Sequence, residues 1–95
     1  MNNRISTIFT NSKKKLITFV TGGDPDFETS NKIIENLANS GADIIEIGMP
    51  FSDPMADGPT IQLSSLRAIN NGTDLNRIFS ICENFRKKNT TTPLI

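Results

Sequence analysis

One acidic side chain interrupts an otherwise apolar run of this sequence. Glu46 lies within the run IIEI at residues 44–47, with no polar neighbour in sequence to account for it. Removal from water disfavours the charged form of a carboxylate and adjusts it to exchange protons near neutrality. Glu46 is therefore a candidate general acid or base. The alternatives are a structural glutamate paired with a distant lysine or arginine, and a glutamate at the edge of a sheet.

Two more carboxylates follow in a proline-rich loop at residues 50–59. Asp53 and Asp57 each stand next to a proline or a glycine, where aspartate is an ordinary turn residue. Taken alone, each is interpreted as a turn former. Their position favours a catalytic role, because they directly follow the segment that carries Glu46 and would lie at the same end of a sheet.

The other reactive residue types have simpler interpretations. The run Gly22-Gly23-Asp24 could cradle a phosphate at a helix N-terminus, but without a lysine or a third glycine a tight turn is the better interpretation. The aspartates of this segment and of the 50–59 loop have no recognisable metal-ligand spacing, so no metal site is predicted. Cys82 lies on an apolar helix face and is interpreted as part of the core.

The composition excludes several classes of protein. Ten basic and ten acidic residues cancel, so no basic excess exists to bind nucleic acid. The sequence has no histidine, which removes histidine-based triads and histidine-ligated metal sites. No apolar stretch approaches the ~20 residues of a membrane span, and a single cysteine fits a reducing compartment. We therefore expect a cytoplasmic protein without a nucleic-acid or membrane partner.

Two segments that must position these residues are predicted to be strands. Residues 16–21 and 43–49 are rich in β-branched and apolar residues, and residues 93–95 begin a third such segment. Both complete segments are apolar on both faces, which is typical of buried parallel strands. Strand alternation places Ile44, Glu46 and Gly48 on one face, and Ile45, Ile47 and Met49 on the other.

Amphipathic helices separate the predicted strands. A short one opens the chain, and a second begins at Asp24 as its cap with Pro25 in the first turn and ends before Gly41. A third covers residues 60–71, and Thr73 can cap a fourth. The expected apolar faces, in chain order, are Ile5, Ile8 and Phe9; Phe27, Ile33, Ile34, Leu37 and Ala38; Ile61, Leu63, Leu66 and Ile69; and Leu75, Ile78, Phe79, Cys82 and Phe85.

This alternation of strands and helices predicts an α/β fold. Its sheet would be parallel, with right-handed crossovers. Glu46 would lie near the carboxyl end of its strand, which is the catalytic end of α/β barrels.

Two long motifs resemble one known family. Residues 19–25 (FVTGGDP) are similar to the first strand and turn of the tryptophan synthase alpha subunit family, and residues 45–62 (IEIGMPFSDPMADGPTIQ) to its second strand and loop. The resemblance extends over essentially the whole chain, with Gly22 standing where some members carry a larger residue. It implies a TIM (β/α)8 barrel of which residues 1–95 are the N-terminal part of a single domain, with the first two to three βα units.

The resemblance also implies a lyase of tryptophan biosynthesis that cleaves indole-3-glycerol phosphate to indole and glyceraldehyde 3-phosphate by a retro-aldol reaction. By resemblance, Glu46 and Asp57 are the catalytic carboxylates, the first moving protons and the second holding the indole N–H. Phe19 and Ile61 match positions that line the substrate pocket. Pro50 and Asp53 match the part of the loop that faces the beta subunit, in an alpha2-beta2 tetramer. The family's alpha subunit uses no cofactor, and pyridoxal phosphate belongs to the beta subunit.

The length departs from the family pattern, because a complete barrel needs ~250 residues and this chain has 95. Two alternatives to the lyase therefore stay open. One is another phosphate-binding α/β barrel enzyme with the same early topology, and only the 50–59 loop separates it from the first interpretation. The other is a non-catalytic α/β fragment that docks a partner protein through that loop.

Overall fold

The computed structural model describes residues 3–51 and 57–95. The helices and strands follow in the order α1 (Arg4–Ile8), β1 (Ile17–Thr21), α2 (Phe27–Asn39), β2 (Ile44–Gly48), α3 (Pro59–Asn70) and α4 (Leu75–Lys88). All predicted helices and both complete strands are therefore present. No helix in the described residues is long and apolar enough to cross a membrane.

The two strands form a parallel sheet in which Phe19 lies opposite Glu46. A third segment adds to the other edge of β2, where Leu94 makes a parallel bridge with Ile45. The amide of Ile47 donates to the carbonyl of Ile95 at 2.8 Å, and the amide of Ile95 donates to the carbonyl of Ile45 at 2.9 Å. The predicted third strand thus begins beside β2, in the sequential parallel order that a βαβ fold produces.

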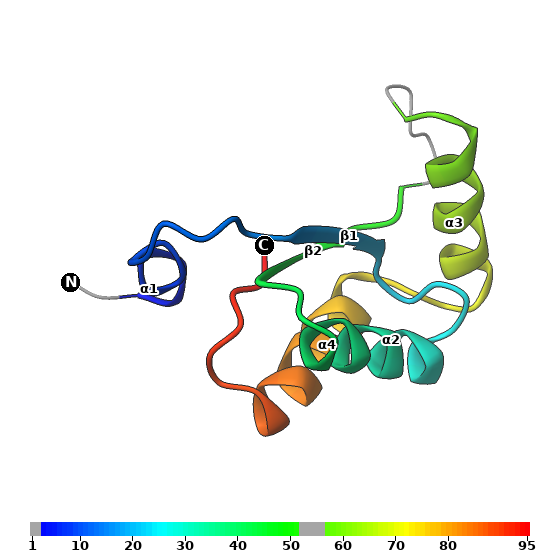
Figure 1. Ribbon diagram of the computed structural model, residues 1–95. Coiled ribbons are helices and arrows are strands. Elements are labelled where there is room, and N and C mark those ends of the chain that lie inside the picture. The colour runs from blue at the N-terminus through cyan, green and yellow to red at the C-terminus, as the bar shows by residue number, and fades with distance from the viewer. Residues whose placement is uncertain (1–2, 52–56) are drawn as a thin grey trace.

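Helices α2 and α4 pack side by side against one face of the sheet (Figure 1). The core between them and the sheet consists of buried apolar residues: Ile34, Ala42, Ile45, Ile78, Ile81 and Phe85. Ile47 and Met49 also pack against it. The predicted alternation of β2 is therefore correct, with Ile45, Ile47 and Met49 toward the helices.

Two predicted helix caps are each displaced along the chain. Asp26, not Asp24, caps α2, because its carboxylate accepts from the amide of Thr29 at 2.8 Å. Hydrogen bonds from Thr29 hold the pKa of Asp26 below its usual value. Asp74, not Thr73, caps α4 through the amide of Arg77, at 2.9 Å. In both cases the cap is an aspartate whose carboxylate accepts from the amide three residues later, and not the predicted residue.

The predicted apolar face of α3 is only partly correct, because Ile61 and Ile69 are partly buried. Leu63 and Leu66 are 56% and 53% exposed, whereas the buried residues of the helix are Ser64, Ser65 and Ala68. The face of α4 is only partly correct, because Leu75 and Phe79 are exposed and Ile81 is buried instead. The apolar spacing identified these helices but only part of the side of each that meets the sheet.

The second face of the sheet is open in the described residues. Leu16, Ile17 and Phe19 are 55%, 49% and 47% exposed, and α1, at the end of the molecule away from α3, does not cover them (Figure 1). The prediction that both strands are buried on both sides is therefore wrong for β1, whereas Ile44 on the same face of β2 is only 2% exposed. This open face carries Glu46, which is half-buried.

We expect the 95-residue chain, purified alone, to fold without a cooperative transition. Large apolar side chains on the open sheet face and on α3 are exposed, and a sheet this small leaves backbone groups at its edges unpaired. Calorimetry and amide hydrogen exchange are the appropriate measurements, since the chain has neither tryptophan nor tyrosine. A sharp heat-absorption peak together with slowly exchanging amides in β2 would contradict this expectation.

Candidate active site

An aromatic ring and a carboxylate share the open face of the sheet. Phe19 on β1 pairs in register with Glu46 on β2, so both side chains emerge on the same side. Gly48 follows two residues later on that face, and a Cβ atom built there would come within 2.5 Å of Cζ of Phe19. The ring of Phe19 therefore lies over Gly48, at the carboxyl end of β2.

Glu46 is not held by an opposite charge within the described part of the chain. The two ion pairs there join Arg67 to Asp24 and Lys88 to Glu35. The interpretation of Glu46 as the structural partner of a lysine or arginine thus finds no support among residues 3–51 and 57–95. The side chain stands instead on an accessible apolar surface beside an aromatic ring, where a ligand could reach it.

Asp57 lies immediately before α3 and is attached to it. Its side chain is exposed, and its backbone carbonyl accepts a hydrogen bond from Nε2 of Gln62 at 2.6 Å. The next residue, Gly58, is the N-cap of α3, and Pro59 occupies the first turn. The glycine and the proline start the helix here, so the position of Asp57 depends on that of α3.

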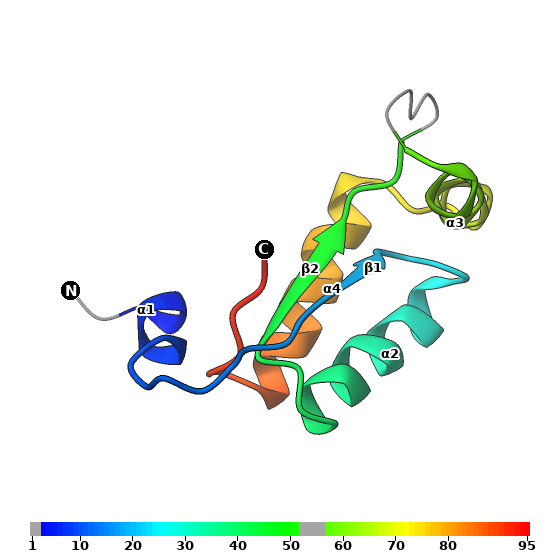
Figure 2. The ribbon, with the colours of Figure 1, turned by 45° about the horizontal axis from the view of Figure 1, so that its top comes forward.

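Ile61 lies in the first turn of α3 and is half-buried. Its carbonyl accepts from the hydroxyl of Ser64 at 2.9 Å, and the same hydroxyl shares a hydrogen bond of 2.7 Å with that of Thr21, the last residue of β1. Figure 2 shows α3 standing at the end of the sheet toward which both strands point. The structure therefore places the first turn of α3 at the carboxyl end of the strands, whose middle residues on the open face are Phe19 and Glu46.

Neither of the two residues predicted to face a partner is tested by the structure. Pro50 is buried directly after β2, and its contact with a partner stays a prediction. Asp53 lies outside the described residues. Its place at an interface stays a prediction.

Sequence reasoning missed an ion pair at the same end of the sheet. Nε and Nη2 of Arg67 donate to the two carboxylate oxygens of Asp24 at 2.8 and 3.0 Å. This contact raises the pKa of Arg67. Arg67 follows Ser64 by three residues, so the two share a helix face. That polar face was the available signal.

The tight-turn interpretation of the glycine pair is correct. Gly23 has φ of 83°, a backbone conformation that favours glycine, and its amide donates to Oγ of Ser30 at 2.9 Å. That amide is thus already satisfied and is not free to bind a phosphate. Among the described residues, no group of three or more acidic or cysteine side chains could hold a metal ion.

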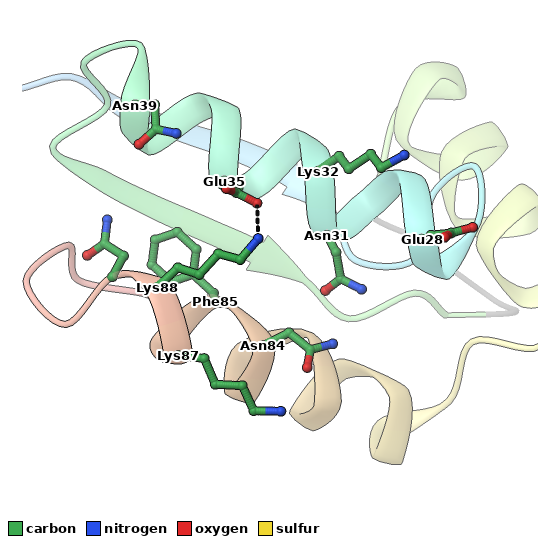
Figure 3. Close-up of a pocket in the computed structure, with 10 residues that line it drawn as sticks. Glu28, Asn31, Lys32, Glu35, Asn39, Asn84, Phe85, Lys87 and Lys88 are labelled. Atoms are coloured by element: carbon green, nitrogen blue, oxygen red, sulfur yellow. Dashed lines mark hydrogen bonds and ion pairs between the residues drawn. The ribbon is translucent and has the colours of Figure 1, made fainter.

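A groove of about 350 Å³ lies elsewhere, between α2 and α4. Figure 3 shows its polar lining, with the Lys88–Glu35 ion pair of 3.4 Å across it. The groove contains none of the predicted site residues. Cys82 on α4 is half-buried, and burial raises the pKa of its thiol, which argues against a nucleophile and for a core residue.

Comparison with known proteins gives one consistent result. The family model described as tryptophan synthase alpha chain matches residues 5–95. The tryptophan synthase alpha chain of Geotalea uraniireducens is 55% identical over 96 residues, covering 97% of this chain and 36% of that protein. The alpha chain of Geotalea daltonii is 52% identical, covering 100% of this chain and 36% of its own length. This chain therefore spans about a third of the length of these relatives.

Solved structures agree with the sequence comparison. The crystal structure of tryptophan synthase subunit alpha from Legionella pneumophila str. Paris has a TM-score of 0.93 and 39% identity, and the match covers 99% of this chain and 37% of that one. A structure described as the tryptophan synthase a2b2 complex from Pyrococcus furiosus has a TM-score of 0.78 and 44% identity, covering 84% of this chain and 32% of that one.

Proposed function

The chain belongs to the tryptophan synthase alpha chain family, and on that premise we propose that the complete protein cleaves indole-3-glycerol phosphate to indole and glyceraldehyde 3-phosphate. The fold fits the first part of a (β/α)8 barrel, with strands in the order β1, β2 and the segment at Leu94. Residues 1–95 would then be the N-terminal part of one barrel domain. A complete barrel of this kind has ~250 residues.

The pairing of Phe19 with Glu46 on the open face is the observation that carries this proposal. In a barrel this face points inward, and its carboxyl end forms the mouth at which such enzymes bind substrates. An indole ring needs a flat apolar wall and a proton donor within reach of its ring carbon. Phe19 and Ile61 supply apolar surface and Glu46 supplies the proton.

The reaction needs one proton to be added to the ring carbon at one end of the breaking bond, and one to be removed from the hydroxyl at the other end. Glu46 would donate a proton to the ring carbon that bears the glycerol chain, which turns the indole into a leaving group. It would then take the proton of the adjacent glycerol hydroxyl as the carbon–carbon bond breaks and the aldehyde forms. The electrons of the broken bond return to the ring and restore its aromaticity. Proton inventory is unchanged, so one carboxyl group can serve both steps.

Asp57 would act at the other side of the ring. Protonation of the ring carbon leaves positive charge on the indole nitrogen, and a carboxylate that accepts the N–H hydrogen bond stabilises that charge. The exposure of Asp57 and its attachment to α3 through Gln62 suit this role, because the residue is accessible while its backbone is held. No cofactor takes part in this scheme.

We propose the tryptophan synthase beta subunit as partner. The Pyrococcus furiosus structure is described as showing mutual activation within an a2b2 complex, and the same assembly is proposed for this protein. The 50–59 loop would contact the beta subunit through Pro50 and Asp53. Pyridoxal phosphate would belong to that partner alone, and the complex would act in the cytoplasm.

Indole release by the complete protein tests this proposal. The complete alpha chain is incubated with indole-3-glycerol phosphate, with and without saturating beta subunit, and indole is measured. We expect slow release by the alpha chain alone and faster release in the complex. A folded complete protein that binds the beta subunit but releases no indole would favour the alternative of a docking module. Release of a different product would favour another barrel enzyme.

A further inference from the structure

The buried residues of helix α3 are small, and its larger apolar residues are only partly buried or exposed. Ser64, Ser65 and Ala68 are buried, and Leu63 and Leu66 are more than half exposed. Small side chains allow close approach but bury little apolar area, which limits how strongly packing alone can hold the helix. The position of α3 therefore depends on its specific polar contacts.

These contacts join one face of α3 to the end of β1 and the turn that follows it. Ser64 and Arg67 of the helix and its C-cap residue Asn71 make these contacts, and Ser64 binds Thr21. Arg67 makes two parallel hydrogen bonds to Asp24, and Nδ2 of Asn71 donates to the carbonyl of Pro25 at 2.7 Å. A bidentate guanidinium–carboxylate pair fixes orientation as well as distance, which a lysine cannot do.

These polar contacts connect the two parts of the proposed site, Asp57 before α3 and the sheet face that carries Phe19 and Glu46. On one side, α3 holds the backbone of Asp57 through Gln62. On the other, the turn that contains Asp24 follows β1, whose Phe19 lies opposite Glu46. A rotation or a slide of α3 would therefore carry Asp57 away from the sheet face on which Glu46 stands.

We propose that Arg67, through its paired hydrogen bonds with Asp24, is a positioning residue that sets Asp57 relative to Glu46. This rests on the proposed function. Arg67 does not touch the substrate in this scheme, and both oxygens of Asp24 are occupied by the guanidinium. Its contribution is geometric, and misplacement of a reacting group by about 1 Å can cost ~10²-fold in rate.

The test uses Arg67→Lys and Asp24→Asn in the complete protein, assayed for indole release. Lysine keeps the positive charge but cannot make the two parallel hydrogen bonds of the guanidinium. Asparagine keeps the shape of Asp24 but loses its negative charge. We expect kcat to fall about 10- to 100-fold in each, with little change in KM. The melting temperature of Arg67→Lys should stay close to that of the wild type, because the Arg67 side chain is 53% exposed, lysine keeps the charge, and solvent weakens the pair.

Lys88→Ala is the control, since it breaks the second ion pair of the described residues, which joins α4 to α2 away from the proposed site. It should keep wild-type kcat. Wild-type kcat in both Arg67→Lys and Asp24→Asn would overturn the inference. So would a fall in kcat that merely follows a loss of folded protein in both variants.

A double-mutant comparison separates this inference from the proposed function. In an Asp57→Ala background, Arg67→Lys should cause no further loss, because the group that it positions is gone. An undiminished effect there would mean that Arg67 acts by another route and would overturn the inference. Wild-type activity of Asp57→Ala itself would instead refute the role that the proposed function gives to Asp57.

Discussion

Glu46→Gln in the complete protein is expected to lower kcat for indole release by about 10²–10⁴-fold, the usual contribution of a positioned general acid–base. Glutamine keeps the size of the side chain and part of its hydrogen bonding, but it cannot donate and recover a proton. Glu46 is half-buried on the open face and has no ion-pair partner among the described residues. The substitution by glutamine therefore breaks no ion pair there. The protein should therefore remain folded.

The measurement is steady-state indole release, with thermal melting as a check on folding. Glu35→Gln is the matched control, because it makes the same chemical change on α2, away from the proposed site. There the carboxylate of Glu35 forms an ion pair of 3.4 Å with Lys88. We expect wild-type turnover from that variant. More than about a tenth of wild-type turnover in Glu46→Gln would rule out the proposed proton transfer, which is expected to contribute at least ~10²-fold.

Asp57→Ala is expected to lower kcat by about 10²–10³-fold, with and without the beta subunit, the range found when one group that stabilises transition-state charge is removed. With alanine at this position, no carboxylate accepts the N–H hydrogen bond or stabilises the positive charge on the indole nitrogen. The loss should be in turnover and not in folding, because the side chain is exposed and the hydrogen bond from Gln62 reaches the backbone carbonyl. Indole release by the variant, with the melting temperature measured in parallel, tests this.

Asp53→Ala is the comparison variant for Asp57→Ala, four residues earlier in the same loop. We expect it to spare much of the activity of the alpha chain alone and to reduce stimulation by the beta subunit. The prolines of the loop restrict its backbone, so a change at one end should be transmitted to the other. If ordering of the loop both completes the site and favours the partner, binding at the two sites is coupled reciprocally. Equal fold-stimulation of Asp53→Ala and wild type would show that the loop does not couple them.

Local sequence was sufficient for the elements and for the face that carries the proposed chemistry. The alternation of residues 43–49 placed Ile45 and Ile47 toward the helices and Glu46 on the opposite face, and the structure agrees. The glycine turn after β1 and the start of a third strand were also predictable. These features depend on backbone geometry with a short period, which neighbouring residues determine by themselves. The roles of Glu46, Asp57, Phe19 and Ile61 stay predictions until they are tested.

Tertiary structure alone decided which surfaces are covered and which polar groups meet. The spacing of Leu63 and Leu66 shows that α3 has an apolar side, but burial depends on what packs against that side, and the helix meets β1 with Ser64 instead. Asp24 was predicted to cap a helix, yet its partner is Arg67, which is 43 residues away along the chain. A contact over that separation depends on how strands and helices pack in three dimensions, and no local period of the sequence encodes it.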